Sequence, residues 1–528
     1  MNSKAGSWPR SIGIVVIGIV APASVLPLAS AQSAVDIGVQ LDRGEDLGQN
    51  FGTLFEARTK DGKFVLGAGF LGLYNTYYRS DRHTVHFFIR PAGGARKHTM
   101  GELPRPGKLA GAYLFSRDGT LYAADADVHA WNESEGRWNE EAPNQRHRTR
   151  VANGMLVFDG SQVEFNGERM LTGPAQGRYS HFYYAQSHLF FYHTYWAEQR
   201  GYRAYTADRA GYSKLYACPW RNGEGPIDLA KAVVLTVPTV GEIPFAYGQL
   251  RGDVLTCSNI GGLYAFDGNR WRTVLDGDLN TSYQVYSMLN FHDKLLMGQY
   301  PTGELFEFNG ETVTHLEGWP PRMDGVRGSA REAQSTTIYG GQLYVGVWPW
   351  GELWRYHPGT KDWNLAKRMF DHPAPTEKTT HPYENECAAL GVVSNQWGQR
   401  VTSLVASGPS LMVSTSAKWP CKWEPKFDFV GRDKWKAYGT VSRLTVPGHL
   451  SAPLAWTEGT TELRFTVSDA GIAIIQDGNV AARTEATNAL SSEIASMTGL
   501  TDITWGAGVY GAFGGSKLDG ELRPAAHR

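Results

Sequence analysis

The chain has 528 residues, of which 42% are hydrophobic and 12% aromatic, so it can bury a large core and has the composition of a folded globular protein. Lys and Arg number 51 against 52 Asp and Glu, which leaves a formal net charge of −1. This balance lacks the basic excess of general nucleic-acid-binding proteins, and we expect no nucleic-acid partner.

The first 31 residues predict a secretory signal peptide. Lys4 and Arg10 supply positive charge, an apolar run occupies 12–21, and Ala29-Ser30-Ala31 fits a cleavage site. A membrane anchor is the alternative, which Pro22 makes less favourable. No later segment reaches the ~20 apolar residues of a membrane-spanning helix. We therefore expect a secreted or periplasmic protein with no stable membrane span.

From 32 to 445, short alternating apolar runs are separated by Gly, Asn and Asp, a pattern that predicts many short strands. One hairpin recurs as DVLTCSNIGGLYAFDG (253–268), KLLMGQYPTGELFEFNG (294–310) and QLYVGVWPWGELWRYHPG (342–359). Looser copies lie at 120–136, 155–167, 188–196 and 410–420, and 63–75 fits the start of the series. Strands and Gly turns with a period of roughly 40–50 residues are typical of β-propeller blades.

We therefore predict an all-β fold in which 32–445 form a β-propeller of seven blades, with eight as the alternative count. A two-sheet sandwich is the alternative fold, but it leaves the similarity of so many hairpins unexplained. The phrases QLYVGVW and GLYAFDG resemble the texture of kelch-like propellers over about 50–440. That resemblance concerns architecture and not chemistry.

Beyond 445 the pattern changes, and ELRFTVSDAGIAIIQDGNVAAR (462–483) predicts further strands. We expect 446–528 to be a small C-terminal β extension that either closes the last blade or forms an appendage.

Four cysteines, Cys218, Cys257, Cys387 and Cys421, permit disulfides in an oxidising compartment. Cys387 and Cys421 lie in predicted long loops, where a crosslink would be most useful. Cys218 and Cys257 lie in apolar strand patterns, where buried free thiols are an equal alternative.

In a propeller, the turn between the second and third strands of a blade lies on the same face as the linkers between blades. Trp348 and Trp350 lie in one such turn. The expanded turn at 416–438 carries Trp419 and Trp423 among six Lys or Arg residues. Aromatic rings and cations together suit sugar rings and carboxylates. We predict that these four tryptophans form an exposed substrate-binding surface; packing between blades is the alternative.

Five linkers lead into innermost strands, at 178–184, 243–249, 282–288, 329–335 and 399–405, and their ends should converge on the central channel. Four candidate catalytic residues lie in these linkers, namely His181, Tyr247, Arg331 and Arg400. The fifth, His193, lies at the end of the strand that follows the first linker. The candidate substrate-binding residues are Tyr183, Tyr283, Gln284, Glu332 and Gln334. Hydrogen-bonded channel residues and inter-blade ion pairs are the structural alternatives.

A His or Tyr base, a Tyr or His acid and an Arg that neutralises a carboxylate are what β-elimination of a uronate needs. The stretch SHFYYAQSHLFFYH (180–193) is similar to the His-containing strand pair of secreted propeller polysaccharide lyases that cleave ulvan and rhamnose–glucuronate polymers. That similarity implies a lyase acting on an acidic, uronate-containing polysaccharide or oligosaccharide. A non-catalytic propeller that binds glycan or protein through the same face is the alternative, and a propeller hydrolase or quinone-type oxidoreductase has less support.

We predict no metal site, because His83 and His86 would point to opposite faces of a strand. A structural calcium ion held by backbone carbonyls would leave no sequence signal and stays open. Glu332 and Glu386 are an alternative pair of glycosidase carboxylates, whose geometry the sequence does not specify.

Overall fold

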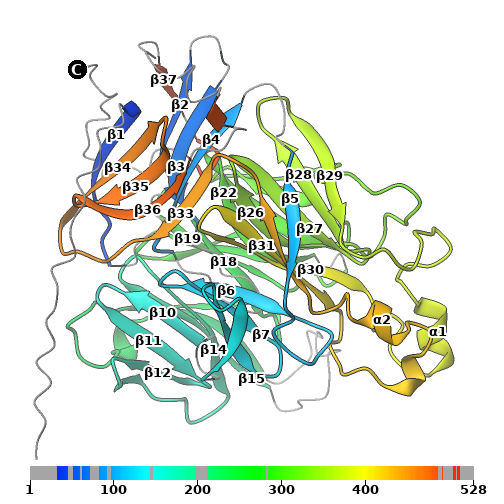
Figure 1. The fold of residues 1–528 in the computed structure, drawn as a ribbon. Coiled ribbons are helices and arrows are strands. Elements are labelled where there is room, and N and C mark those ends of the chain that lie inside the picture. The colour runs from blue at the N-terminus through cyan, green and yellow to red at the C-terminus, as the bar shows by residue number, and fades with distance from the viewer. Residues whose placement is uncertain are drawn as a thin grey trace, which may run out of the picture.

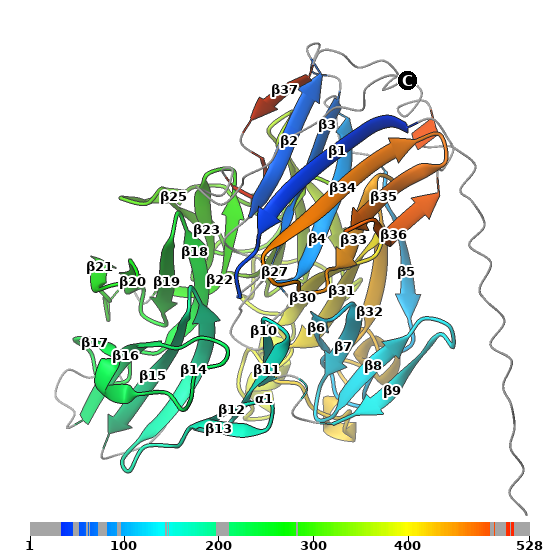
Figure 2. The ribbon, with the colours of Figure 1, turned by 90° about the vertical axis from the view of Figure 1, so that its left-hand side faces the viewer.

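A computed structural model gives the structure of the chain (Figures 1 and 2). It describes residues 33–511 except 46–51, 60–61, 63, 72–81, 92–96, 143–144, 146, 197–210, 281–282, 486–489, 492–502 and 507. The predicted signal peptide lies outside the described residues.

Among the described residues, seven antiparallel sheets have the strand order of propeller blades, each beginning with an innermost strand. The first blade contains β6 (Tyr113–Arg117), β7 (Thr120–Ala124), β8 (Val128–Asn132) and β9 (Arg137–Glu141). The second contains β10 (Arg148–Val151), β11 (Gly154–Asp159), β12 (Gln162–Phe165) and β13 (Glu168–Leu171). The third contains β14 (Arg178–Ala185), β15 (His188–Trp196), β16 (Gly211–Pro219) and β17 (Val233–Thr236), with the short helix η3 (Leu229–Lys231) before β17.

The remaining blades follow in chain order. The fourth contains β18 (Pro244–Leu250), β19 (Asp253–Ser258), β20 (Leu263–Phe266) and β21 (Trp271–Leu275). The fifth contains β22 (Gln284–Phe291), β23 (Lys294–Tyr300), β24 (Leu305–Phe308) and β25 (Val313–Leu316). The sixth contains β26 (Glu332–Tyr339), β27 (Gln342–Trp348), β28 (Glu352–His357) and β29 (Asp362–Arg368). The seventh contains β30 (Gln399–Ser407), β31 (Ser410–Ala417), β32 (Val441–Thr445) and the upstream strand β5 (Thr99–Leu103).

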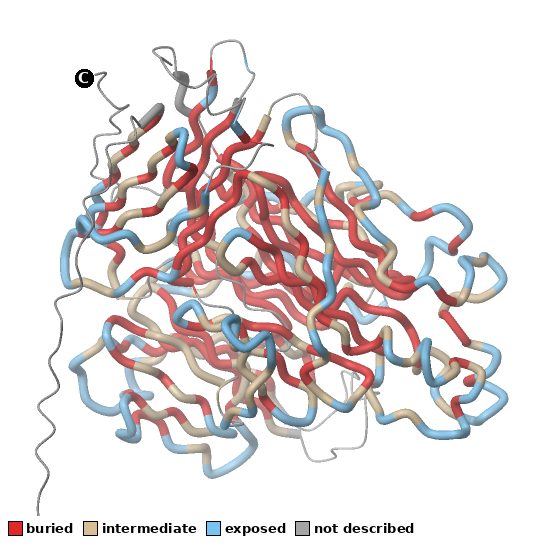
Figure 3. Tube along the Cα trace, viewed as in Figure 1, coloured by how far each residue is buried: buried red, intermediate tan, exposed pale blue. Residues whose placement is uncertain are grey.

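The predicted propeller fold is therefore confirmed, and the recurring hairpins are the second and third strands of their blades. The hairpin at 342–359, for example, is β27 paired with β28, from Leu343 opposite Tyr356 to Val347 opposite Glu352. The ring closes where β5 pairs with β32 as the outermost strand of the seventh blade. An early strand thus completes the last sheet, which joins the two ends of the repeat series. Figure 3 shows the interior strands of the blades buried.

Two further sheets form a β-sandwich from both ends of the chain. One contains β1 (Ser33–Asp42), β34 (Thr460–Ser468), β35 (Gly471–Gln476) and β36 (Asn479–Glu485). The other contains β33 (His449–Pro453), β4 (Thr84–Pro91), β3 (Phe64–Phe70), β2 (Thr53–Thr59) and β37 (Ile503–Gly506). Phe55, Phe87 and Phe465 meet in the core between them, with Phe465 5.3 Å from each of the other two rings.

This sandwich differs from the predicted domain boundaries. The strands within 33–91 were assigned to the propeller, including the hairpin at 63–75, but they pair with the C-terminal strands. The region after 445 is the other half of that sandwich and does not close the propeller. Pairing between strands about 360 to 450 residues apart leaves no local signal in the sequence, because alternation identifies a strand but not its neighbour.

The sandwich covers one end of the propeller, which we call the sandwich end (Figure 2). Tips of the hairpins between first and second strands meet it there: Gly340 N–H donates to His449 Nδ1 (3.2 Å), and Ser451 N–H donates to the Gly408 carbonyl (2.8 Å). The turns between second and third strands lie at the opposite end, which we call the loop end. Helices α1 (Glu384–Ala389) and α2 (Arg432–Trp435) and the short helix η4 (Pro425–Phe427) belong to its long loops (Figure 1).

Cys218, Cys257, Cys387 and Cys421 are unpaired, so the expected disulfide is not formed in the structure. Among the described residues, no helix is long and apolar enough to cross a membrane.

Candidate functional site

The innermost strands of the sixth and seventh blades bring a carboxylate and two cations together at the loop end. Glu332 begins β26, Arg400 is the second residue of β30, and Lys418 directly follows β31. Arg400 Nη2 lies 3.1 Å from Glu332 Oε2, and Lys418 Nζ pairs with Glu332 Oε1. We call these three residues, with Trp348 and Tyr286 around them, the Glu332 cluster.

Burial differs among the charged members of the cluster. The side chains of Glu332 and Arg400 are each 2% exposed, whereas that of Lys418 is 15% exposed. Two cations share one carboxylate, so the group carries a surplus positive charge, and only Lys418 extends it toward solvent. A surplus cation in a desolvated place favours an anionic ligand, because its attraction is screened less than in water.

Protonation states follow from this geometry. Burial alone would raise the pKa of Glu332, but Lys418 and Arg400 outweigh it and hold that pKa below its ordinary value. Burial lowers the pKa of Lys418 to about 8, although Glu332 opposes the shift. Lys418 is therefore mostly protonated at neutral pH, yet close enough to its pKa to lose the proton in mildly alkaline solution.

Aromatic side chains flank the ion pairs of the cluster. The Trp348 ring centre lies 4.6 Å from Lys418 Nζ, and Tyr286 O–H lies 3.3 Å from Glu332 Oε1 and donates to Gln284 Oε1 (2.7 Å). Trp348 packs directly on the backbone of Gly398. A Cβ atom at that position would lie 2.2 Å from Trp348 Nε1, so only glycine permits the approach.

A histidine from the loop after β29 completes the surroundings of the cluster. His381 lies 4.9 Å from Trp348, ring centre to ring centre, and its Nδ1 lies 3.6 Å from Glu384 Oε2. Burial lowers the pKa of His381, with a smaller opposing effect from Glu384, so the imidazole is neutral at pH 7. Tyr300, paired with Gln284 across β22 and β23, has its pKa raised by burial and then by Glu332.

Four predicted site residues meet in or beside this cluster: Gln284, Glu332, Trp348 and Arg400. Trp348 is only 2% exposed, so it lines the cluster and is not the exposed platform that was predicted. Gln334 lies two residues further along β26 and is also buried. Trp419 follows Lys418, is 45% exposed, and donates through Nε1 to Asn395 Oδ1 (3.1 Å).

Two other predicted site residues, Arg331 and Trp350, make contacts within the fold that explain their positions. Arg331 pairs with Glu352 (3.1 Å) and donates to the carbonyls of Thr302 (3.2 Å) and Pro321 (3.0 Å). The ion pair with Glu352 lies within the sixth blade, and the hydrogen bond to Thr302 reaches the preceding blade. Trp350 is 1% exposed and packs under the guanidinium of Arg368, so its predicted exposure is wrong.

Tyr183 and Tyr247 lie toward the sandwich end, contrary to the prediction. Their rings stack with centres 4.8 Å apart, and the Tyr183 hydroxyl accepts hydrogen bonds from Arg82 (3.3 Å) and Gln249 (3.2 Å). Arg82 also donates to the carbonyl of Tyr184, next to the hairpin tip. A strand rises about 3.3 Å per residue. Tyr183 is five residues beyond Arg178, the first residue of β14, and therefore lies far from the loop end.

The remaining predicted residues are dispersed. His181 lies in the third blade with φ of 54°, its Nδ1 2.9 Å from Ser180 Oγ and its ring against Tyr192. His193 Nε2 contacts the Gln176 carbonyl (2.9 Å) and the Tyr212 hydroxyl (3.1 Å), and burial lowers its pKa.

Two aromatic candidates also have neighbours within the fold. Tyr283 packs edge-on against Phe306, with ring centres 5.0 Å apart. Trp423 is half-buried, and the guanidinium of Arg432 lies 5.8 Å from its ring centre. Glu386 is exposed on α1 and Glu332 is committed to its cations, which does not favour a glycosidase pair of these two residues.

Sequence reasoning missed Lys418, His381, Tyr286 and Tyr300. The signal for Lys418 was present, since the basic and aromatic segment 416–438 had been selected as a unit and Lys418 is its first cation. His381 had no comparable signal, because it lies in a loop whose return to the channel depends on tertiary packing.

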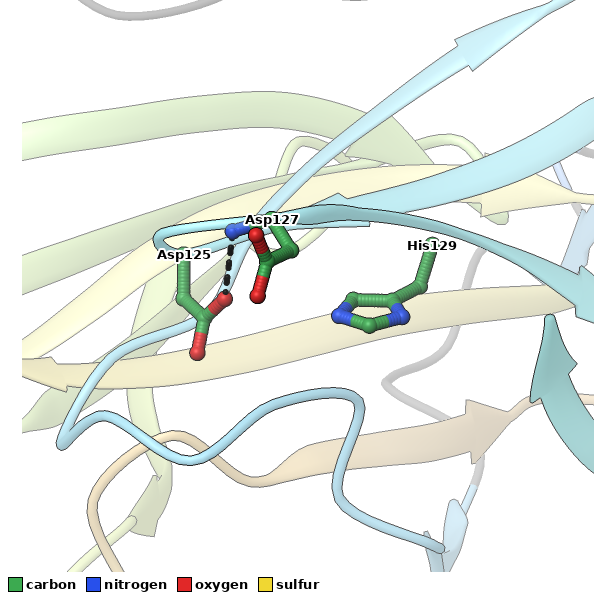
Figure 4. Close-up of side chains that lie close together, drawn as sticks. All are labelled: Asp125, Asp127 and His129. Carbon is green, nitrogen blue, oxygen red and sulfur yellow. Dashed lines mark hydrogen bonds between the residues drawn. The ribbon is translucent and has the colours of Figure 1, made fainter. Parts of the chain in front are cut away.

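Asp125, Asp127 and His129, at the β7–β8 turn and in β8, have ligand-type atoms within 4.8 Å of one another (Figure 4). Asp125 Oδ1 accepts the N–H of Asp127 (3.1 Å), and its Oδ2 accepts those of Lys108 (3.0 Å) and Leu109 (3.1 Å). These main-chain hydrogen bonds explain the Asp125 carboxylate as a turn-forming group.

No protein-family model matches the chain, and no curated protein matches it. Among solved structures, it is similar to YCF48 from Cyanidioschyzon merolae, with 12% identity over 66% of this chain and 99% of that one, at a TM-score of 0.35. The WD40 β-propeller domain of Doa1 shows 10% identity over 63% of this chain and 99% of that one, at a TM-score of 0.32. BamB from Moraxella catarrhalis shows 12% identity over 78% and 98%, at a TM-score of 0.29. At these scores the propeller assignment rests on the sheet topology, and similarity to polysaccharide lyases stays a prediction.

Proposed function

We propose that this protein is a carbohydrate-active propeller that binds an acidic, uronate-containing glycan at the Glu332 cluster and cleaves it by β-elimination. The observation that carries the proposal is that Arg400 and Lys418 share the single carboxylate of Glu332. The surplus positive charge suits a sugar carboxylate, and damping that carboxylate's charge is the first requirement for removing the neighbouring C5 proton.

The second requirement is a base within reach of the bound sugar. His381 supports this role because it is neutral, 12% exposed, and beside Glu384, which can orient its ring. In the proposed step, His381 takes the C5 proton, the C4–O bond breaks, and a C4–C5 double bond forms. The departing oxygen receives a proton from Tyr300, whose raised pKa keeps its hydroxyl protonated. His381 therefore replaces His181 as the proposed base.

An exposed indole supports the sugar-binding part of the proposal. Trp419 is held by Asn395 and follows Lys418 directly, so a ring stacked on Trp419 would lie beside the cationic cluster. The secretory signal expected at the N-terminus would deliver the protein to a compartment where such glycans occur, and this localisation is part of the proposal.

A non-catalytic glycan-binding propeller is the second candidate. The observation that favours it is the 2% exposure of both Glu332 and Arg400, which leaves few groups within reach of a substrate.

The deciding experiment incubates the purified protein with polygalacturonate, alginate and a glucuronan, and follows the near-ultraviolet absorbance of the unsaturated product. We expect product from at least one polymer, its loss in His381→Ala and its retention in His181→Ala. Binding without product would establish the non-catalytic alternative. If the protein neither binds nor cleaves any of the three polymers, that is, if none of them is a ligand or substrate, the proposed function is refuted.

A further inference from the structure

Five innermost strands share a backbone irregularity at the same level of the propeller. The pairing of each first strand with its second strand shifts register once, in the third to seventh blades. The residues at these β-bulges are His181 and Phe182 of β14, Phe245 of β18, Tyr286 of β22, Gln334 of β26 and Thr402 of β30. A bulge re-aims side chains relative to a regular strand, and bulges are common next to functional sites.

The bulge level lies two residues further along the innermost strands than Glu332 and Arg400, and Tyr286 belongs both to this level and to the Glu332 cluster. Tyr286, Gln334 and Thr402 each follow by two residues a residue at the loop end of its strand, namely Gln284, Glu332 and Arg400. Two residues of strand span about 7 Å, roughly the length of one sugar ring. Bulge residues of neighbouring blades touch, since the Phe245 and Tyr286 rings lie 5.6 Å apart. Tyr286 also reaches Glu332 in the next blade (3.3 Å).

Gln334 and Thr402 are buried polar residues at this level. They are 3% and 1% exposed, and neither the Gln334 amide nor the Thr402 hydroxyl has a hydrogen-bond partner among the residues that the structure describes. Gln299 of β23 offers a partial contrast, because it is fully buried and its amide nitrogen donates to Thr302, although its carbonyl oxygen also has no partner among the described residues. Buried polar groups without partners destabilise a fold, and such groups in native proteins call for an explanation such as a ligand.

We propose that Gln334 and Thr402 form an inner subsite on the propeller axis that hydrogen-bonds the hydroxyl groups of the sugar whose carboxylate is held at the Glu332 cluster. This inference rests on the proposed function. An amide and a hydroxyl together both donate and accept, as sugar hydroxyls do, and neither carries charge. The inner subsite would therefore recognise the uncharged part of the ligand, while Lys418 recognises its carboxylate.

The test uses two nearly isosteric substitutions that delete the polar groups, Gln334→Met and Thr402→Val, with Gln299→Met as the matched control. Thermal unfolding without ligand and affinity for a galacturonate trisaccharide are measured for each full-length variant. We expect Gln334→Met and Thr402→Val to keep or raise the melting temperature and to weaken binding by about tenfold, the loss of one or two hydrogen bonds. Gln299→Met should lower the melting temperature and leave the affinity within about twofold.

The outcomes separate this inference from the proposed function. If the wild-type protein binds the trisaccharide and the Gln334→Met and Thr402→Val variants bind it equally well, the inner subsite is refuted and the proposed function is not. A lower melting temperature in both variants also overturns it, because the two polar groups would then have structural partners. A wild-type protein that binds none of the acidic glycans refutes the proposed function, and the subsite is lost with it.

Discussion

The ammonium group of Lys418 lies 4.6 Å from the centre of the Trp348 ring and forms an ion pair with Glu332. A lysine held in this way is charged, desolvated and still in contact with solvent, because 15% of its side chain is exposed. Buried cations normally neutralise a buried anion one to one, as Arg331 does with Glu352. Here the carboxylate of Glu332 is already engaged by Arg400, so Lys418 has capacity for a second anion.

We expect Lys418→Met to weaken binding of a galacturonate oligosaccharide by about 10- to 100-fold, the range for losing a hydrogen bond to a charged group. Lys418→Arg should retain most of the affinity, since it keeps the charge. Isothermal titration calorimetry measures both. Equal affinity in the Met variant would show that the ligand carboxylate is held elsewhere.

The same affinity should depend on pH in a defined direction. Because burial lowers the pKa of Lys418 to about 8, the amine is protonated below that pH and neutral above it. Affinity for a carboxylate should therefore be constant well below pH 8 and fall as the pH rises through this value. A bound anion favours the protonated amine, so binding near the pKa should take up a proton, seen as different heats in two buffers. Lys418→Arg should remove this dependence, since a guanidinium stays protonated. A decline that persists in the Arg variant would assign the titration to another group.

Glu332→Gln should destabilise the fold strongly, because it leaves two buried cations without their shared carboxylate. The expected loss is about 3–5 kcal/mol, measured by urea unfolding. The double variant Glu332→Gln with Lys418→Met removes one charge of each sign and should recover part of that loss. An unchanged stability in Glu332→Gln would contradict the buried ion cluster.

Trp350 and Trp419 should respond to truncation in opposite ways. Trp350→Ala removes a fully buried indole and should cost about 3–5 kcal/mol of stability. Trp419→Ala, at an exposed position, should change stability by less than about 0.5 kcal/mol and weaken glycan binding by roughly 2- to 10-fold. Unfolding curves and binding titrations on the same preparations distinguish the two effects. Unaltered binding by Trp419→Ala would remove this indole from the proposed sugar surface.

Acid should weaken the fold through the histidines at the sandwich end. Burial lowers the pKa of His86 to about 3, and burial followed by the nearby His86 lowers that of His449 well below 6.5. Both are neutral in the folded protein but protonate near pH 6.5 when unfolded, so the unfolded state binds more protons below that pH. The contribution of these histidines to the free energy of unfolding should be complete above pH 6.5. It should decrease toward pH 3 by up to about 1.4 kcal/mol per pH unit for each histidine. In His86→Leu, the free energy of unfolding should fall less steeply between pH 6.5 and pH 3, and its pH dependence above pH 7 should be unchanged. If the acid slope of the variant equals that of the wild type, His86 does not contribute to it.

The sequence alone determined the blades, the hairpins within them and the end at which their turns gather. These features depend on local signals, namely alternating apolar residues and Gly, Asn or Asp turns, which repeat seven times and need no knowledge of distant partners. It also placed Glu332 and Arg400 correctly at the starts of innermost strands.

The tertiary structure decided the sandwich, the burial of Trp348 and Trp350, and the composition of the Glu332 cluster. Trp350 lies in a turn, and turns are usually exposed, but its backbone bridges to Gln399 at the start of β30 and Arg368 lies over its ring. His381 and Lys418 come together because two long loops fold onto the same blade edge. Such contacts join residues far apart in the chain, and their energies depend on packing that no local pattern encodes.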